Sequence, residues 1–169
     1  SIGLAAATRV GNLVGEADPT QAQYAAYVTV LVCFAGACFN TLCILLLRES
    51  LVGLYSGDAD VIAIAVNLLL FAAIFQIPDG LQMGALGSLR GYKDTFAPML
   101  MLIVTYWFLA LPVGYVLTYY GILGNALGAP GIWIGMITGL VTFSALILPR
   151  LRYTSKKFIL KANLKPLSP

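Results

Sequence analysis

The sequence predicts an all-α integral membrane protein with four full transmembrane helices and part of a fifth. Hydrophobic residues make up 60% of the 169 residues, and the mean hydropathy is +0.89. Charged residues make up only 10%, whereas a soluble domain has about 25%. The apolar residues also occur in runs of helix length, and about 20 such residues cross a hydrocarbon core of about 30 Å.

Five apolar segments follow one another in the chain, separated by short polar or glycine-rich loops. The first is a partial span with Arg9 near its exit, and the loop EADPTQ after it places Pro19 at the start of the next helix. We expect these segments to form one partial membrane lobe over residues 1–152, followed by a basic tail over 153–169. The predicted spans cover residues 1–15 (partial), 22–48, 60–90, 97–120 and 130–150.

The inner spans carry a few polar and aromatic groups. Asn40 and Thr41, in the second span, offer hydrogen-bonding groups that we expect to bond to a neighbouring helix rather than to a ligand. The loop over 48–60 then brings one positive and three negative charges before the third span. The fourth span, which follows the turn RGYKDTFAP, holds Tyr106 and Trp107 near mid-depth. Two rings at that depth either pack in the core or stack on an aromatic cation.

Asp79, in the third span, is an ionisable residue inside an apolar run. It lies eleven residues before Arg90, where charge resumes. At about 1.5 Å per residue it is roughly 16 Å deep, near the middle of the hydrocarbon core. A charge there costs on the order of 3 kcal/mol, and such residues mark ion or substrate paths. The alternative is a structural aspartate that is hydrogen-bonded to a neighbouring helix.

The neighbours of Asp79 favour an ion site. Pro78 cannot donate a hydrogen bond to the carbonyl oxygen of Ile74, so we expect a bend or hinge there and a freed backbone acceptor. Gly80, Gly84, Gly87 and Gly91 form a smooth stripe that allows another helix to approach closely. Residues three and four positions from Asp79 share its helical face and would line a wet, amphipathic cavity: Phe75, Gln76, Gln82 and Met83.

The distribution of charge predicts the orientation in the membrane. The predicted spans place nine of the ten Lys and Arg residues on one side, including six from Arg150 onward, and only Arg48 on the other. The positive-inside rule makes the first side cytoplasmic. The six positive charges of the tail either contact anionic lipid or mark a stop-transfer end, and the net charge of +3 is explained by topology rather than by nucleic-acid binding.

The residue inventory argues against an enzyme. The chain has no histidine, which excludes a Ser–His protease and removes the usual ligand of a catalytic zinc site. An intramembrane aspartyl protease needs two facing aspartates, and Asp79 is the one aspartate within the predicted spans apart from the helix-end Asp60. We therefore expect neither catalysis nor an organic cofactor.

Three stretches resemble one transporter family: AATRVGNLVGEADPTQA, LLLFAAIFQIPDGLQMGALGSLRGYKDTFAP and YWFLALPVGYVL. They look like the C-terminal half of a multidrug and toxic compound extrusion (MATE) transporter of the NorM-like branch. The resemblance implies a twelve-helix protein in two lobes, of which this chain holds the end of the eighth helix and helices nine to twelve. It implies that Asp79 is the coupling carboxylate and that the N-terminal half, with a second acidic coupling residue, is missing here.

The resemblance also implies an activity, with one departure from the family pattern. The family exports cationic, often aromatic drugs against an inward Na⁺ or H⁺ gradient, which in a bacterium places it in the inner membrane. Sodium-coupled members carry a tyrosine one turn before the aspartate, where this chain has Phe75. The missing hydroxyl weakens a Na⁺ site at Asp79, so the coupling ion is either H⁺ or Na⁺. A related flippase for lipid-linked substrates and a truncated, non-transporting membrane module are the alternative functions.

Overall fold

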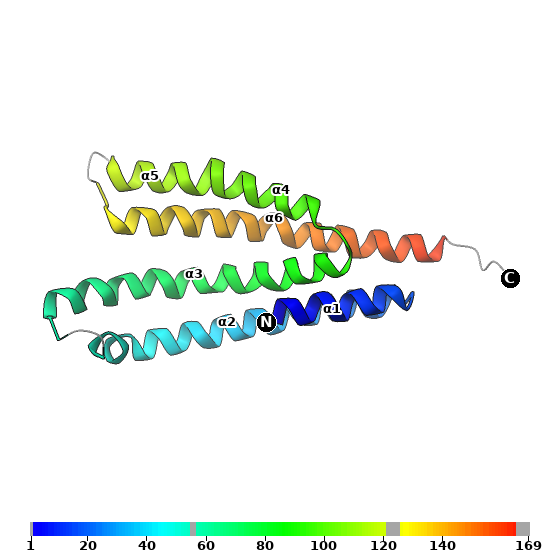
Figure 1. Cartoon of the computed structure of the whole chain (residues 1–169), viewed down its shortest axis with the longest axis horizontal. Helices are drawn as coiled ribbons and strands as arrows, with labels where there is room; N and C mark the ends of the chain where they lie inside the picture. Colours follow the sequence, from blue (N-terminus) through cyan, green and yellow to red (C-terminus); the bar gives the residue numbers. More distant parts are fainter. Residues whose placement is uncertain (1, 55–56, 121–125, 165–169) are drawn as a thin grey trace. The chain divides into compact units, whose positions relative to one another are not determined.

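The computed structural model describes residues 2–54, 57–120 and 126–164 of the chain, and Figure 1 shows its elements in order. The described residues form helices and contain no β-strand, which confirms the all-α prediction. The elements are α1 (Ile2–Gly15), α2 (Pro19–Gly53), α3 (Ala59–Gly91), α4 (Phe96–Thr105), the π-helical segment η1 (Tyr106–Ala110), α5 (Leu111–Tyr119) and α6 (Ala129–Asn163).

Four helical segments in the described part of the chain are long and apolar enough to cross a membrane. They are Pro19–Gly53, Ala59–Gly91, Phe96–Tyr119 and Ala129–Asn163, with α4, η1 and α5 together making the third of them. The shorter α1 corresponds to the partial first span. The prediction of four full spans and part of a fifth is therefore confirmed.

Two helix ends differ from the predicted span ends. Helix α2 continues to Gly53, so the polar stretch that begins at Arg48 is helical at first. Helix α6 continues through Pro149 to Asn163, so the basic segment from residue 153 begins as a helix. Hydropathy marks where a segment leaves the apolar core, whereas Leu, Arg and Lys have high helix propensity and prolong the helix beyond that point.

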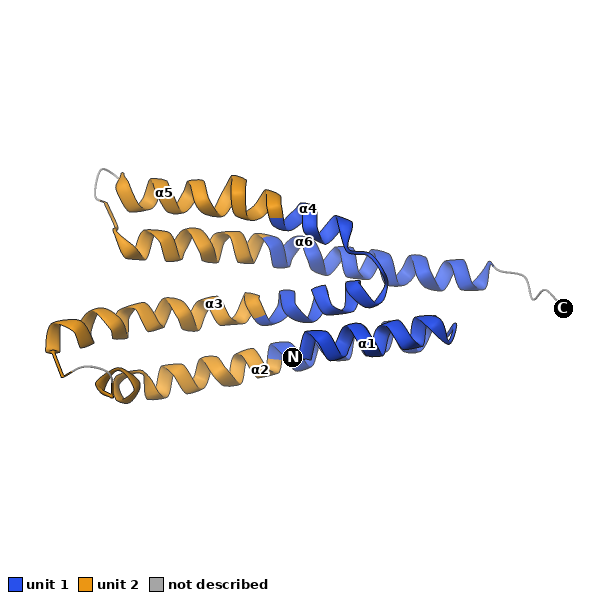
Figure 2. Cartoon of the chain, in the orientation of Figure 1, with its two compact units in different colours: residues 1–34, 80–102, 143–169 blue, residues 35–79, 103–142 orange. Residues whose placement is uncertain are grey.

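The described chain divides into two compact units, which Figure 2 distinguishes by colour. Unit 1 consists of residues 1–34, 80–102 and 143–169, and unit 2 of residues 35–79 and 103–142. Helices α2, α3, α4 and α6 each contribute residues to both units. The basic residues are divided unequally: eight of those described belong to unit 1, and only Arg48 belongs to unit 2.

Unit 1 has a core of buried side chains from α1, α2, the end of α3 and α6. Phe143, Ile147 and Leu151 lie one turn apart along α6 and are almost completely buried. Small residues complete the contact, because alanines on the facing helices allow the backbones to approach. The core consists of Val10, Ala22, Ala25, Ala26, Ala85, Leu89, Tyr92, Phe143, Ile147 and Leu151.

The glycine stripe of α3 packs against two helices of unit 1. A Cβ atom at Gly84 would lie 2.8 Å from Cα of Val30 in α2. A Cβ atom at Gly87 would overlap the backbone of Gly3 in α1, and one at Gly91 would lie 2.7 Å from the side chain of Val10. These separations are shorter than any real Cβ contact, so the glycines are required for the packing, as the sequence predicted.

In unit 2, glycines also allow close packing of two helices, here α5 and α6. A Cβ atom at Gly131 would lie 2.6 Å from the backbone nitrogen of Thr118, and one at Gly135 would overlap Gly114. The predicted hydrogen bond from the second span is also present, since Thr41 Oγ1 donates to the carbonyl oxygen of Ala73 in α3 at 3.0 Å. Close backbone contact and a hydrogen bond between helices therefore stabilise this unit without a large aliphatic core.

Candidate functional site

Asp79 lies in the middle of α3, directly after a buried proline. The helix runs from Ala59 through Pro78 to Gly91 as one continuous element, so any bend at the proline occurs without a break. Pro78 is buried and Asp79 is half-buried. Because proline has no N–H, the regular helical pattern lacks the donor that would bond to the carbonyl oxygen of Ile74. The carboxylate is thus placed directly after the proline inside α3.

Phe75, one turn before Asp79, packs against an aromatic residue of the last helix. Its ring centroid lies 6.1 Å from that of Trp133 in α6, and the two ring planes meet at 88°. An edge-to-face pair of this kind is the preferred geometry for two aromatic rings. The sequence places Trp133 only at the mouth of the last span and does not connect it to the site. Nothing in the spacing indicates which helix faces Phe75.

The other predicted residues of α3 differ in exposure. Gln76 is half-buried, Gln82 is 8% exposed and Met83 is 49% exposed. Helical spacing puts them on the Asp79 face, as expected. The division between the compact units falls directly after Asp79, so Gln82 and Met83 belong to unit 1. A single cavity lined by all of these side chains remains a prediction.

Tyr106 and Trp107 open a π-helical segment, which was not predicted from the sequence. Five residues, Tyr106–Ala110, form η1, and the N–H of Leu111 donates to the carbonyl oxygen of Tyr106 five positions earlier. The signal was Pro112, because a proline that follows has no N–H for the regular helical pattern and is accommodated by the wider turn. Tyr106 is half-buried and Trp107 is 66% exposed. Their contact with a substrate stays a prediction.

An apolar cavity of about 570 Å³ lies in unit 2 beside the Phe75–Trp133 pair. Trp133 forms part of its wall, and aliphatic residues of α2 and α3 form the rest. The volume is in the range of small-molecule sites, and a wall without charge suits an apolar or aromatic group. It is lined by Leu51, Val52, Val61, Ala65, Leu68, Leu69, Ala72 and Trp133.

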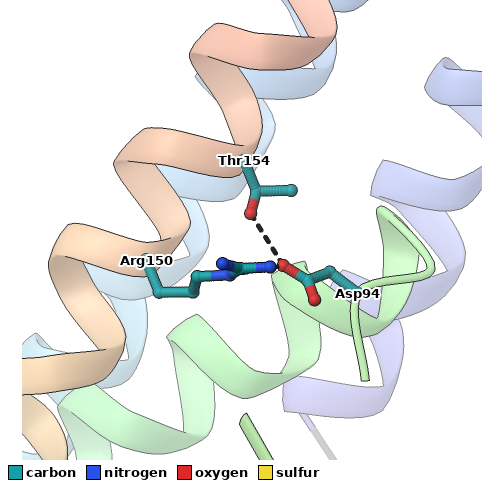
Figure 3. Close-up of polar contacts among 3 residues, drawn as sticks. All are labelled: Asp94, Arg150 and Thr154. Atoms are coloured by element: carbon teal, nitrogen blue, oxygen red, sulfur yellow. Dashed lines mark hydrogen bonds and ion pairs between the residues drawn. The ribbon is translucent and has the colours of Figure 1, made fainter. Parts of the chain in front are cut away.

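A second polar cluster, in unit 1, fixes the turn between α3 and α4 to α6 (Figure 3). The Nε of Arg150 donates to Oδ2 of Asp94 at 2.7 Å, and Oγ1 of Thr154 donates to the same oxygen at 2.8 Å. The arginine and the threonine lie one turn apart on α6 and so present both donors on one face. Lys93, just before the aspartate, has a φ of 60°, which turns the chain sharply after α3.

The surroundings of Asp94 stabilise the charged form of its carboxyl group. Partial burial raises the pKa of the carboxyl, but the hydrogen bonds from Arg150 and Thr154 and the charges of Arg150 and Lys157 outweigh it and leave the pKa below its usual value. No sequence pattern indicated this pair, because 56 positions separate its two charged members. A compact turn rich in charge was the only signal available.

These features together are typical of a membrane transporter rather than a simple anchor, since an anchor needs neither an intramembrane carboxylate nor a proline in its span. A family model described as MatE matches residues 1–116. The chain is 40% identical over 159 residues to "Multidrug resistance protein PmpM" of Pseudomonas aeruginosa and 42% identical over 158 residues to "Multidrug resistance protein NorM" of Vibrio cholerae. The chain therefore belongs to the multidrug and toxic compound extrusion (MATE) family.

The matches cover most of this chain but only part of each relative. They cover 94% and 93% of this chain but only 33% and 35% of the two relatives, so the chain spans about a third of their length. Among solved structures, the crystal structure of the eukaryotic MATE transporter AtDTX14 superposes with a TM-score of 0.80 over 95% of this chain and 36% of that chain. At 20% sequence identity this likeness concerns the fold alone.

Proposed function

We propose that this chain is part of a secondary active multidrug exporter that exchanges cationic aromatic drugs for H⁺ or Na⁺, with Asp79 as the coupling carboxylate. The observation that carries the proposal is the position of Asp79. It lies mid-way along an apolar helix, after buried Pro78, and one turn beyond the Phe75 ring. The relatives bear the name of multidrug resistance proteins, which is consistent with this activity.

Competition at one carboxylate would couple the two fluxes. A carboxylate in a low-dielectric site is costly without a counter-ion, so it binds a proton, a sodium ion or a cationic drug, one at a time. Arrival of the coupling ion from outside would release the drug, and arrival of a drug from inside would release the ion. Relative movement of transporter lobes, with Pro78 as hinge, would expose the site to each side in turn.

The aromatic residues would select the cargo. Phe75 offers a ring face to a cation at the carboxylate, and Tyr106 and Trp107 offer further rings for stacking. Gln76, Gln82 and Met83 would supply amide and thioether contacts around the charge. Sodium prefers several oxygen ligands, and Phe75 supplies none, so the site accommodates a proton more readily than a sodium ion. No organic cofactor is required.

The proposal includes a location and partners. The chain would lie in a bacterial inner membrane, with the basic C-terminal segment in the cytoplasm by the positive-inside rule. It would work with the remaining half of the transporter and contact membrane lipid. A flippase for lipid-linked phosphates is the second candidate. The predicted spans over 22–48, 60–90, 97–120 and 130–150 carry basic residues only at their ends, which favours cationic over anionic cargo.

The test is export of a fluorescent cation by the full natural polypeptide carrying Asp79→Asn. Asparagine preserves the size and most hydrogen bonds of the side chain but cannot carry the charge. We expect gradient-driven export to be lost while the protein still accumulates in the membrane. Asp79→Glu should retain part of the activity with an altered pH profile, because the charge survives at a displaced position.

Export is to be measured in energised cells or inverted vesicles across pH and sodium concentration, normalised to protein amount. Phe75→Tyr is the matched probe of the ion, since it adds one oxygen beside the carboxylate and should increase sodium dependence. Wild-type export by the Asp79→Asn protein would show that the aspartate is only structural and would end the proposal.

A further inference from the structure

A cavity of about 410 Å³ opens in unit 1 where α3 ends and α4 begins. Arg90, in the last turn of α3, lines it together with Thr95 and Phe96. This is the region of the chain in which the predicted membrane interface falls, because Arg90 is where charge resumes after the third span. Neither Asp79 nor the aromatic residues of the proposed transport site are among the residues that line this cavity.

The cavity presents a positive charge, because its acidic residue is held in an ion pair and, within the described part of the chain, its basic residue is not. Asp94 lines the cavity, but its carboxylate is held by Arg150 at 2.7 Å and by Thr154 at 2.8 Å. Arg90 is exposed, and its guanidinium has no ion-pair or hydrogen-bond partner among the residues that the structure describes. The paired aspartate therefore leaves the arginine available to an anionic group. A guanidinium is well suited to a phosphate, which it can contact through two parallel hydrogen bonds.

The remaining wall is apolar and continues along the membrane-spanning part of both helices. Leu86 of α3 and Met99 and Leu102 of α4 line it. Phe96 at its rim is 71% exposed, and Met99 is 51% exposed. A ligand that fits must therefore be anionic at one end and hydrocarbon at the other. A free phosphate satisfies only the first condition, and an aliphatic drug only the second.

We propose that this cavity binds an anionic phospholipid, with Arg90 contacting the headgroup phosphate and the apolar wall of α3 and α4 contacting the first part of the acyl chains. The other basic residues of unit 1 also favour binding of an anionic lipid, since anionic lipids gather at a basic membrane face. The bound lipid would hold the α3–α4 turn, which Asp94 already fixes to α6. The inference does not depend on the role of Asp79.

The experiment is a lipid titration of the purified full natural polypeptide in detergent, followed by native mass spectrometry. Phosphatidylglycerol is the anionic probe, and phosphatidylcholine of the same chain length is the neutral one. We expect the wild-type protein to retain phosphatidylglycerol in preference. Arg90→Gln should weaken that retention about fivefold, the contribution of one basic side chain near an anionic surface. Arg90→Lys should restore most of it.

Lys156→Gln is the control, because it removes one exposed positive charge from α6 at a residue that does not line the cavity. It should leave the preference unchanged, and the thermal stability of each variant shows that it is folded. If Arg90→Gln and Lys156→Gln weakened the preference for phosphatidylglycerol equally, the preference would come from general electrostatic attraction. That result would overturn the proposed binding site. An unchanged preference in Arg90→Gln would overturn it also, and displacement of the lipid by millimolar inorganic phosphate would reassign the cavity to a free anion. None of these outcomes bears on drug export.

Discussion

Tyr92 is a buried side chain of unit 1 whose polar atom is unsatisfied. It is 7% exposed and packs on Phe158 with ring centroids 5.8 Å apart. Its hydroxyl has no hydrogen-bond partner among the described residues. Burial, with a smaller contribution from Tyr27, raises the pKa of Tyr92 to about 12. The ring therefore stabilises the core, while the hydroxyl adds a desolvation cost.

Tyr92→Phe should accordingly raise the free energy of unfolding by about 1 kcal/mol, because it removes an unpaired buried hydroxyl and keeps the ring. The measurement is thermal unfolding in detergent. Wild-type stability should also fall from pH 10 to about 12, since the unfolded tyrosine loses its proton near its ordinary pKa of 10.0 while the folded one retains it. Tyr92→Phe should lack that contribution. Destabilisation by about 1 kcal/mol or more would mean that the hydroxyl has a partner.

Asp94 and Arg150 form a charge pair in which the Nε of Arg150 lies 2.7 Å from Oδ2 of Asp94. Asp94→Asn and Arg150→Gln should each lower the stability by about 1.5–3 kcal/mol, because each leaves the other charge partly buried without its partner. The double variant should lose much less than the sum of the two, and a double-mutant cycle in detergent measures the difference. Additive losses would show that the pair does not interact.

The same pair predicts a pH dependence at the acidic end. The folded pKa of Asp94 is depressed below its ordinary value of 3.8. The contribution of the pair is therefore complete above that value and is lost as the pH falls through the lower, folded pKa. The loss of stability below about pH 3.8 should be smaller in Asp94→Asn than in the wild-type protein.

At the level of elements, α3 is positioned by glycines rather than by large side chains. Gly87 touches the backbone of Gly3 in α1, whereas a Cβ atom at Gly36, in the middle of α2, would have nothing within 4 Å. The two residues thus form a matched pair, since both are helical and differ in what surrounds them. One replacement tests packing and the other tests only helix propensity.

Gly87→Ala should lower the stability of unit 1 by about 1–3 kcal/mol, because the added methyl group forces α1 and α3 apart. Gly36→Ala, in unit 2, should raise the stability of the protein by about 0.5–1 kcal/mol, because alanine loses less backbone entropy in a helix. Thermal unfolding in detergent gives both values. If the two variants behave alike, the close approach of α1 and α3 is not a feature of the folded protein.

Local sequence patterns predict the spans but not the exact helix ends or the π-helical segment. Each span was found from its hydropathy, because about 20 apolar residues must be buried in lipid whatever their neighbours are. Helices α2 and α6 extend past the predicted span ends to Gly53 and Asn163, because propensity carries a helix beyond the membrane boundary. The π-turn before Pro112 was missed because a proline in a span predicts an irregularity without specifying which kind.

At the scale of the whole molecule, the distribution of basic residues predicts how the chain is oriented. Eight of the described basic residues belong to unit 1, and Arg48 alone belongs to unit 2. A cysteine at Gly57 should be labelled from outside intact cells by an impermeant thiol reagent, and one at Lys156 should not. The background must lack Cys33, Cys38 and Cys43. Labelling of both positions to the same extent would reject the orientation.

The sequence by itself determined the fold class, the number of spans, the glycine-dependent packing of α3 and the isolation of Asp79 in an apolar helix. Each of these depends on local chemistry: hydropathy, the missing side chain of glycine and the cost of a charge in lipid. The tertiary structure alone decided which groups meet. It paired Phe75 with Trp133 and Asp94 with Arg150, residues that lie far apart in the chain. Contacts between distant helices depend on how the helices rotate and pack against one another, and no periodicity within a single helix encodes that.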